Sequence, residues 1–268
     1  MYQDYYNLKE HPFNVTADPD FFYSSTKHSE AFSHLVYGIK QRKGILLVTG
    51  EVGTGKTTLC RTLLNRLDKN TKTALILNPR FSDLQLLKLI MKDLGVEGKF
   101  RNKFALIDAL NQFLLNESSK GNNVVVIIDE AQNLKIPQLE QIRLLSNLET
   151  EKEKLLQIIL VGQPELDEKL RNTALRQLNQ RITVRYHILP LDQNELSGYI
   201  HHRLQIASGN QENSPKFTEK AINAIYEESF GTPRMINILC DRALLAGYVS
   251  ATKMIDEKIV HRCAKEIL

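Results

Sequence analysis

The chain has 268 residues, of which 42% are hydrophobic and 25% charged, and its formal net charge is +4 with a pI of about 8.8. This length suits one large domain or one domain with a small partner, and the apolar content supports a sizeable core. No apolar run is long enough to cross a bilayer, and the first residues lack the basic start and apolar stretch of a signal peptide. The mild positive charge permits nucleic acid or an anionic membrane face as a partner and requires neither.

Short apolar runs alternate with amphipathic stretches as far as about residue 190. The runs are rich in Val, Ile and Leu without polar alternation, which is typical of strands covered on both faces. We expect five such strands, at Ile45–Thr49, Thr73–Leu77, Val124–Ile128, Ile158–Val161 and Thr183–Ile188.

Helical patterns separate these strands. Ser82 and Gln85 have the spacing of a capping box, and Pro137 suits the first position of another helix. The expected helices are Thr57–Leu67, Leu84–Leu94, Phe104–Asn116 and Pro137–Leu148. Strands that alternate with helices predict a parallel sheet with right-handed crossovers.

The pattern changes after about residue 190. Asp192 and Glu195 again have capping-box spacing and open a helix to about Ala207, and Ser208–Pro215 is polar and loop-like. Further helices are expected at Thr218–Ser229, Pro233–Tyr248 and Asp256–Ile267. We therefore predict an α/β domain over residues 1–190, including an N-terminal segment 1–40, and a small all-helical domain over residues 191–268.

The strongest functional signal is a glycine-rich segment between an apolar strand and a helix. Its sequence GEVGTGKT, at Gly50–Thr57, matches the pattern G-x-x-x-x-G-K-[ST]. The glycines let the backbone curl so that successive N–H groups face phosphate oxygens, and the following helix adds its positive N-terminus. Lys56 is expected to reach the β- and γ-phosphates of ATP, and the Thr57 hydroxyl to coordinate Mg²⁺. The alternative is a plain turn without a ligand, which does not need these residues in this order.

The nucleotide-binding residues expected from this segment are Gly50, Glu51, Val52, Gly53, Thr54, Gly55, Lys56, Thr57 and Thr58.

A second signal is the buried strand that ends in Asp129 and Glu130, because two carboxylates at the end of such a strand are costly without a purpose. Asp129 would hold the Mg²⁺ shell, and Glu130 would orient and polarise the attacking water as a general base. Taken alone, the pair also suits a solvated turn.

The segments GEVGTGKTTLCR, VVVIIDEAQNL and ILVGQPEL resemble the ExeA-type (general secretion pathway protein A) branch of AAA+ ATPases. The N-terminal stretch Tyr5–Phe32 and the later stretch GTPRMINILCDRALLAG resemble the same family. The resemblance runs from about Tyr5 to Leu268 and implies an α/β fold, a P-loop AAA+ domain with a parallel five-stranded sheet followed by a small all-helical lid. ATPases of transposon target selection and of exosortase-associated gene clusters look similar, so the biological process is left open.

The resemblance also assigns roles to single residues. Gln163 takes the place of the sensor-1 polar residue, whose amide would bond the γ-phosphate or the lytic water; the alternative is an ordinary strand-end turn. Asn78 would hold Glu130 away from its working position until a signal arrives, although Asn-Pro is also common in turns. Arg234 resembles the sensor-2 arginine that reports the γ-phosphate to the lid, and a guanidinium suits a phosphate. A surface Arg at a helix start is the other interpretation.

An arginine finger is expected in the stretch that leads into the last strand. In AAA+ proteins such an Arg enters the site of the neighbouring subunit, and fingers contribute on the order of 10³-fold or more in related phosphoryl-transfer sites. We favour Arg181 over Arg176; the alternative for each is a solvated basic helix face. A finger requires a head-to-tail interface, and hence a homo-oligomeric ring or filament.

The remaining candidates carry weaker signals. Phe21, Phe22 and Tyr23 would line the adenine, or would anchor the N-terminal segment to the core. His28, His201 and His202 lack metal-ligand spacing, and we expect surface or capping roles for them. The three cysteines stand far apart, and we expect small buried side chains in a reducing, cytoplasmic setting: Cys60, Cys240 and Cys263.

We expect an ATPase that uses Mg²⁺ and drives assembly or remodelling in a secretion- or pilus-type envelope system. Family members of that kind continue into a membrane-spanning segment and a periplasmic domain, and this chain stops at Leu268 without either. We therefore expect a truncated chain, or a relative that reaches the inner membrane through a membrane-protein partner.

The alternative is a DNA-binding regulator of transposition type. A third interpretation, a nucleotide switch that does not hydrolyse ATP, is disfavoured by Glu130, Gln163 and the two finger candidates. The basic residues that favour DNA are Arg61, Arg66, Lys69, Lys72, Lys99, Arg101 and Lys103, but no reading element is evident.

Overall fold

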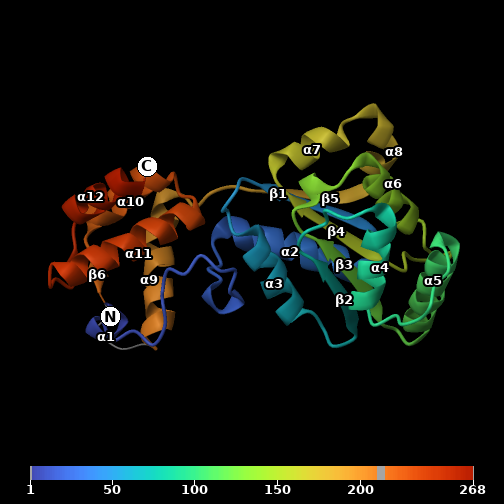
Figure 1. Ribbon diagram of the computed structural model, residues 1–268, viewed down its shortest axis with the longest axis horizontal. Coiled ribbons are helices and arrows are strands. Elements are labelled where there is room, and N and C mark those ends of the chain that lie inside the picture. Colours follow the sequence, from blue (N-terminus) through green and yellow to red (C-terminus); the bar gives the residue numbers. More distant parts are fainter. Residues whose placement is uncertain (1, 210–214, 268) are drawn as a thin grey trace. The chain divides into compact units, whose positions relative to one another are not determined.

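A computed structural model describes residues 2–209 and 215–267. Its contacts divide the chain into two compact units, drawn in Figure 1. We call the first the sheet unit, which holds Glu30–Val52 and Leu63–Ile188. The second, the helical unit, holds the described residues before Glu30, the segment Gly53–Thr62 and the described residues from Leu189 onward.

The sheet unit is built on five parallel strands in the order β2-β3-β4-β1-β5. The five predicted strands and their parallel arrangement are confirmed, with ends that differ by one or two residues. The strands are β1 Ile45–Gly50, β2 Thr71–Ile76, β3 Asn123–Ile128, β4 Gln157–Gly162 and β5 Ile182–Ile188. Because strands adjacent in the sheet are not adjacent in the chain, helical crossovers connect them, as a doubly covered parallel sheet requires.

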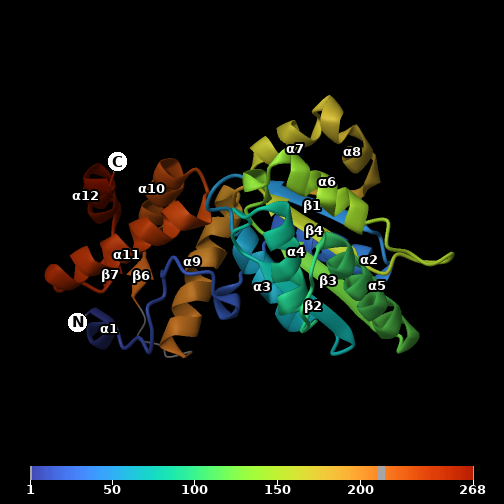
Figure 2. The same cartoon turned by 45° about the vertical axis from the view of Figure 1, so that its right-hand side comes forward.

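Side chains of β1 point alternately into two apolar layers. Ile45 and Leu47 belong to the core cluster shared with alternate residues of β3 and β4. Leu46 faces the other side, where a Cβ added to Gly38 would lie 2.2 Å from its Cδ2, so this glycine lets helix and strand approach closely. The helices are α2 Thr26–Lys40, α3 Lys56–Arg66, α4 Asp83–Asp93, α5 Lys103–Ser119, α6 Ile136–Leu145, α7 Pro164–Leu170 and α8 Arg176–Arg181, with short turns η2 Ala131–Asn133 and η3 Thr173–Leu175. Figures 1 and 2 show α4, α5 and α6 together on one face of the sheet.

Both predicted capping boxes are present. The Gln85 backbone N–H donates to Ser82 Oγ at 3.2 Å, and Gln85 Oε1 accepts the N–H of Ser82 at 2.9 Å. Asp192 and Glu195 make the same reciprocal pair at the start of the first long helix of the helical unit. Pro137 is the second helical residue rather than the first, since α6 begins at Ile136. Residue types at fixed spacing thus fix where these helices begin.

The helical unit contains α1 Tyr2–Tyr5, η1 Pro19–Phe21, α9 Gln193–Ser208, α10 Glu219–Ser229, α11 Pro233–Val249 and α12 Glu257–Ile267. The prediction of an all-helical domain was wrong in one detail, because β6 Lys216–Phe217 pairs in parallel with β7 Met254–Ile255. Two-residue strands are too short to give a periodic sequence pattern. Of the predicted loop Ser208–Pro215, residues 210–214 lie outside the described part of the chain.

The N-terminal segment joins the core of the helical unit through its aromatic side chains. Tyr6 is fully buried and its hydroxyl donates to the carbonyl oxygen of Leu244 at 3.1 Å, while Phe13 and Phe21 lie in the same cluster. The sequence places residues 1–40 in the predicted α/β domain, whereas the contacts group the described residues before Glu30 with the helical unit. The division into folding domains at residue 190 stays a prediction. Across residues 2–209 and 215–267, no helix combines the length and apolarity needed to span a bilayer.

Candidate nucleotide-binding site

The glycine-rich loop after β1 depends on two backbone conformations that favour glycine. Gly53 has φ +83° and Gly55 has φ +90°, both in the range that side chains make costly. A Cβ on Gly53 would lie 2.6 Å from the Cβ of Arg234, and one on Gly55 would lie 3.1 Å from Nε2 of His28. The loop is therefore strained or crowded by any larger residue at either position. Helix α3 starts directly behind it at Lys56.

Arg234 lies against this loop. It is the second residue of α11, whose N-cap is Thr232, and its backbone N–H donates to the carbonyl oxygen of Gly53 at 3.2 Å. Its side chain is exposed. The structure therefore brings the predicted sensor arginine beside the predicted phosphate loop, within one compact unit.

His28 also supports the loop, which the sequence analysis missed. Its side chain is 5% exposed, its Nε2 lies 2.8 Å from the carbonyl oxygen of Thr54, and its Nδ1 lies 2.7 Å from Oγ of Ser25. Since a carbonyl only accepts, Nε2 carries the proton and Nδ1 accepts from the Ser25 hydroxyl in the neutral ring. Burial lowers the pKa of His28, partly opposed by the bond to Thr54. The predicted surface or capping role is wrong for His28, because its side chain is buried and holds a backbone carbonyl. No sequence pattern marks a histidine with that role.

A second group of candidates lies at the carboxyl ends of the strands. Strands β1, β3 and β4 are parallel, and Thr49 pairs with Gly162 while Ile128 pairs with Leu160, so all three end at one edge. Gly50 ends β1 there, and Asp129 and Gln163 follow the other two. Asp129 is 2% exposed, and its Oδ1 accepts the N–H of Glu130 at 2.9 Å. In open parallel sheets this edge is where ligands bind.

Glu130 has a left-handed backbone, with φ 54° and ψ 35°, which is uncommon for a residue with a side chain. Its Oε2 accepts a bond of 2.5 Å from Nε2 of Gln132 and a longer one of 3.4 Å from Nε2 of Gln163. The structure thus brings two predicted site residues together and adds Gln132, which the sequence analysis did not single out. Asn78 is exposed, and no described hydrogen bond joins it to Glu130. The hypothesis that it holds this carboxylate receives no support from the geometry.

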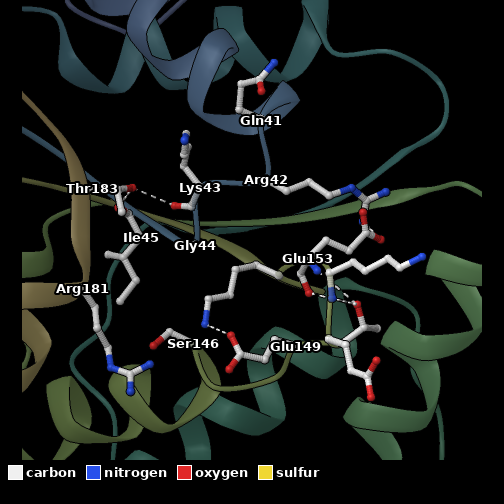
Figure 3. Close-up of a pocket in the computed structure, with 14 residues that line it drawn as sticks. Gln41, Arg42, Lys43, Gly44, Ile45, Ser146, Glu149, Glu153, Arg181 and Thr183 are labelled. Atoms are coloured by element: carbon white, nitrogen blue, oxygen red, sulfur yellow. Dashed lines mark hydrogen bonds and ion pairs between the residues drawn. The ribbon is translucent and has the colours of Figure 1, made fainter.

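The two finger candidates lie elsewhere. Arg181 ends α8 directly before β5, where Ile182 pairs with Ile45 at the start of β1. It lines a pocket at the amino edge of the sheet (Figure 3), whose lining also includes Glu149 and its ion-pair partner Lys154. The hydrogen bond from Lys154 lowers the pKa of Glu149, and the charge of Arg181 adds to this. Arg176 begins the same helix and is exposed.

Comparison with known proteins identifies the family. A family profile described as an AAA domain matches residues 39–170. Over 262 residues, 97% of this chain, the sequence is 45% identical to general secretion pathway protein A of Aeromonas hydrophila. The chain is an AAA-domain relative of general secretion pathway protein A. It spans 47% of the length of that relative.

Solved structures share the fold. Cdc6p of Pyrobaculum aerophilum has a TM-score of 0.70 at 16% identity, covering 93% of this chain and 70% of its own. The Aeropyrum pernix ORC2 protein, in ADPNP–ADP complexes, has a TM-score of 0.67 at 16% identity, with coverage of 92% and 71%. The Drosophila ORC bound to DNA has a TM-score of 0.66 at 18% identity, with coverage of 94% and 65%. Identities this low show the P-loop AAA fold alone.

The residues present suit a nucleotide with its magnesium ion. Two glycines with positive φ give the loop a backbone conformation of the kind that phosphate-binding loops use, and a Cβ on either glycine would crowd a neighbouring side chain. In the described part of the chain, no three His, Cys, Asp or Glu side chains are placed to hold a metal ion by themselves. The oxygen donors expected from the sequence, Thr57 and Asp129, are of the kind that Mg²⁺ takes, since it is usually held by one or two protein ligands together with substrate phosphates and water.

The aromatic residues of the N-terminal segment have structural neighbours. Phe21 is buried in the core of the helical unit, and the guanidinium of Arg203 lies 4.7 Å from its ring centre. Tyr23 contacts the ring of Tyr199 edge-on, at 5.8 Å. These contacts agree with the interpretation of these side chains as core anchors. All three cysteines are free and buried, as expected.

Proposed function

We propose that this chain binds Mg·ATP and hydrolyses it, and that the resulting conformational cycle drives assembly or remodelling. The observation that carries the proposal is the loop from Gly50 to Thr58, because positive-φ glycines and a helix that starts at Lys56 are the parts from which a phosphate cradle is built. The acidic strand end at Asp129 and Glu130 supplies the second part of the chemistry.

Each residue has one task in the proposed reaction. Backbone N–H groups of the loop and the Lys56 ammonium bind the β- and γ-phosphates, while Thr57 and Asp129 would hold Mg²⁺, which neutralises phosphate charge when bound. Water attacks the γ-phosphorus, its proton passes toward the Glu130 carboxylate, and ADP leaves with the electron pair of the broken bond. The remaining contributions to nucleotide binding come from Glu51, Val52, Gly53, Thr54, Gly55 and Thr58.

Arg181 acts in a neighbouring subunit under this proposal. Arg181 lies beside the amino end of β1, whereas Glu130 lies at the carboxyl ends of the strands. Because β1 has six residues, the two residues of one chain are roughly 15–20 Å apart. An arginine side chain does not span that distance. A homo-oligomeric ring or filament would bring Arg181 to the site of the next subunit, with Gln163 and Arg234 sensing the γ-phosphate within each chain.

We further propose that the process is general secretion, because the relative of 45% identity carries that name. A membrane-protein partner would then hold the ATPase at the inner membrane. Binding of DNA is the competing outcome, and the experiment below includes it. Limited proteolysis would test the proposed domains 1–190 and 191–268.

The test is steady-state ATP turnover against protein concentration, with and without duplex DNA, for the parent, Lys56→Ala and Arg181→Ala. We expect turnover per subunit to rise with concentration and to fall by about 10³-fold or more in both variants. DNA stimulation would favour the regulator of transposition type. If Arg181→Ala keeps parental turnover, the trans arginine is wrong; if the parent does not exceed Lys56→Ala, hydrolysis itself is wrong.

A further inference from the structure

The amide side chain of Gln132 joins two strand ends. Its Nε2 donates to Oε2 of Glu130 at 2.5 Å, and its Oε1 accepts the backbone N–H of Gln163 at 3.1 Å. These bonds link the residue after β3 to the residue after β4. Because a backbone N–H can only donate, the amide oxygen must face Gln163, which leaves the NH₂ group for Glu130.

The fold makes room for this amide. A Cβ added to Gly162 would lie 2.8 Å from Oε1 of Gln132 and 3.3 Å from its backbone N, and 2.9 Å from Cδ2 of Leu166. Any larger residue at this position, the last of β4, would push Gln132 aside. Gly162 has no positive φ, so its small size rather than its backbone freedom is what the site uses.

The turn that carries Gln132 is held from a neighbouring helix. The Lys169 ammonium, on α7, donates to the carbonyl oxygen of Gln132 and, at 3.0 Å, to that of Leu134. The Asn133 N–H donates to the carbonyl oxygen of Glu130 at 2.9 Å, which closes the turn behind the left-handed residue. The backbone on both sides of the amide is therefore fixed, and few rotamers remain open to the Gln132 side chain.

Both hydrogen bonds to the side chain of Glu130 are accepted by the same carboxylate oxygen. Both Gln132 and Gln163 donate to Oε2, and among the described residues no hydrogen bond reaches Oε1. A carboxylate held by one oxygen keeps the other available to accept a proton, and its orientation is set by the holder. We propose that Gln132 is a positioning residue that orients Glu130 as the base for water and couples it to Gln163. This inference rests on the proposed hydrolysis.

The experiment compares Gln132→Ala and Gln132→Glu with Asn133→Ala. The Glu variant keeps the shape of the side chain but cannot donate when ionised. Asn133 lies in the same turn and has the same amide chemistry, but its Oδ1 faces Arg80 at 3.4 Å instead of Glu130. At saturating ATP we expect turnover roughly 10- to 100-fold lower in both Gln132 variants and parental in Asn133→Ala, since small misplacements of a catalytic group cost this much.

A structural defect would give a different pattern. Positioning predicts that the affinity for ADP and the KM for ATP change by less than about twofold, with the loss confined to kcat. Gly162→Ala should reproduce the loss, and should cost less in the Gln132→Ala background, because the clash with Oε1 is then gone. Equal turnover in Gln132→Ala and Asn133→Ala, or a loss that appears as weaker binding, would overturn the inference.

Hydrogen exchange tests the contact without any turnover. The Gln163 amide should exchange roughly 3- to 10-fold faster in Gln132→Ala than in Asn133→Ala, without nucleotide, because it loses one hydrogen bond. Unchanged exchange contradicts the geometry and overturns the inference. A parent that hydrolyses no ATP above the Lys56→Ala background overturns the proposed function instead, and the exchange result tells the two failures apart.

Discussion

The two groups of candidate site residues are built by different means. The loop around Gly53 and Gly55 is a backbone structure, held through carbonyl oxygens by His28 and by the N–H of Arg234. The cluster around Glu130 is a side-chain structure, in which amides far apart in the sequence meet one carboxylate. A backbone structure restricts the residue types at fixed spacing, whereas a side-chain cluster depends on register and helix placement. Substitutions in the loop should therefore weaken nucleotide binding, whereas substitutions in the cluster around Glu130 should slow hydrolysis and leave binding unchanged.

Among the substitutions that contrast the two groups, the largest effect is expected from Glu130→Gln, which keeps the shape of the side chain but removes the base. Turnover should fall by about 10²- to 10⁴-fold, the usual contribution of a general base, while the affinity for ADP stays near that of the parent. Single-turnover hydrolysis and equilibrium binding of a fluorescent ADP analogue measure the two quantities. Weaker binding with retained turnover would reverse the roles assigned to the two groups.

The phosphate loop should show the opposite signature in Gly55→Ala. The matched control is Gly95→Ala, because Gly95 has φ +74° but a Cβ there meets nothing within 4 Å. Each substitution should lower the free energy of unfolding by about 1–2 kcal/mol, the cost of a left-handed alanine. Only Gly55→Ala should also weaken ADP binding, by roughly tenfold or more, because its Cβ crowds His28 and alters the cradle.

Denaturant titration and equilibrium binding of both variants measure these changes. Equal loss of ADP affinity in Gly55→Ala and Gly95→Ala would show that the loop conformation is irrelevant to binding. No loss of stability in either variant would show that the positive φ angles carry no cost.

Much of the fold could be predicted because most of its elements have a local cause. The apolar strands, the capping boxes at Ser82 and Asp192 and the glycines of the loop are recognisable over a few residues. Helices α7 and α8, with seven and six residues, are too short for a clear apolar period. The pairing of β6 with β7 involves strands of two residues each, separated by the helices α10 and α11.

The candidate site could likewise be predicted only where a local sequence pattern marks its residues. Motif spacing predicts Lys56, Asp129 and Glu130 as site residues, since each follows a strand end in a fixed pattern. The contact of Gln132 with Gln163 joins residues 31 apart, and that of His28 with Thr54 joins residues 26 apart. No local pattern distinguishes such partners from surface amides or histidines. Gly162 was the one signal that pointed toward Gln132, because a glycine in a buried strand often marks a place where another group approaches the backbone closely.

The smallest expected effect is the pH dependence that His28 gives to the helical unit. Burial lowers the pKa of His28 below its ordinary 6.5, while the bond to Thr54 and the charge of Glu195 act in the opposite direction. Between the lowered pKa and 6.5 the unfolded chain binds more protons than the folded chain. Stability should therefore be fully present above about pH 7, fall as the pH drops through this window, and level off below the folded-state pKa.

The matched variant for this prediction is His28→Gln, which keeps a donor for Thr54 but does not titrate. Burial also lowers the pKa of His202, so the decisive quantity is the difference in unfolding free energy between parent and variant, measured by denaturant at pH 7 and pH 5. The parent should lose its advantage at the lower pH. A difference that stays constant would mean that His28 supports the phosphate loop through its bond geometry alone, and the backbone cradle would then be insensitive to protonation of the histidine that holds it.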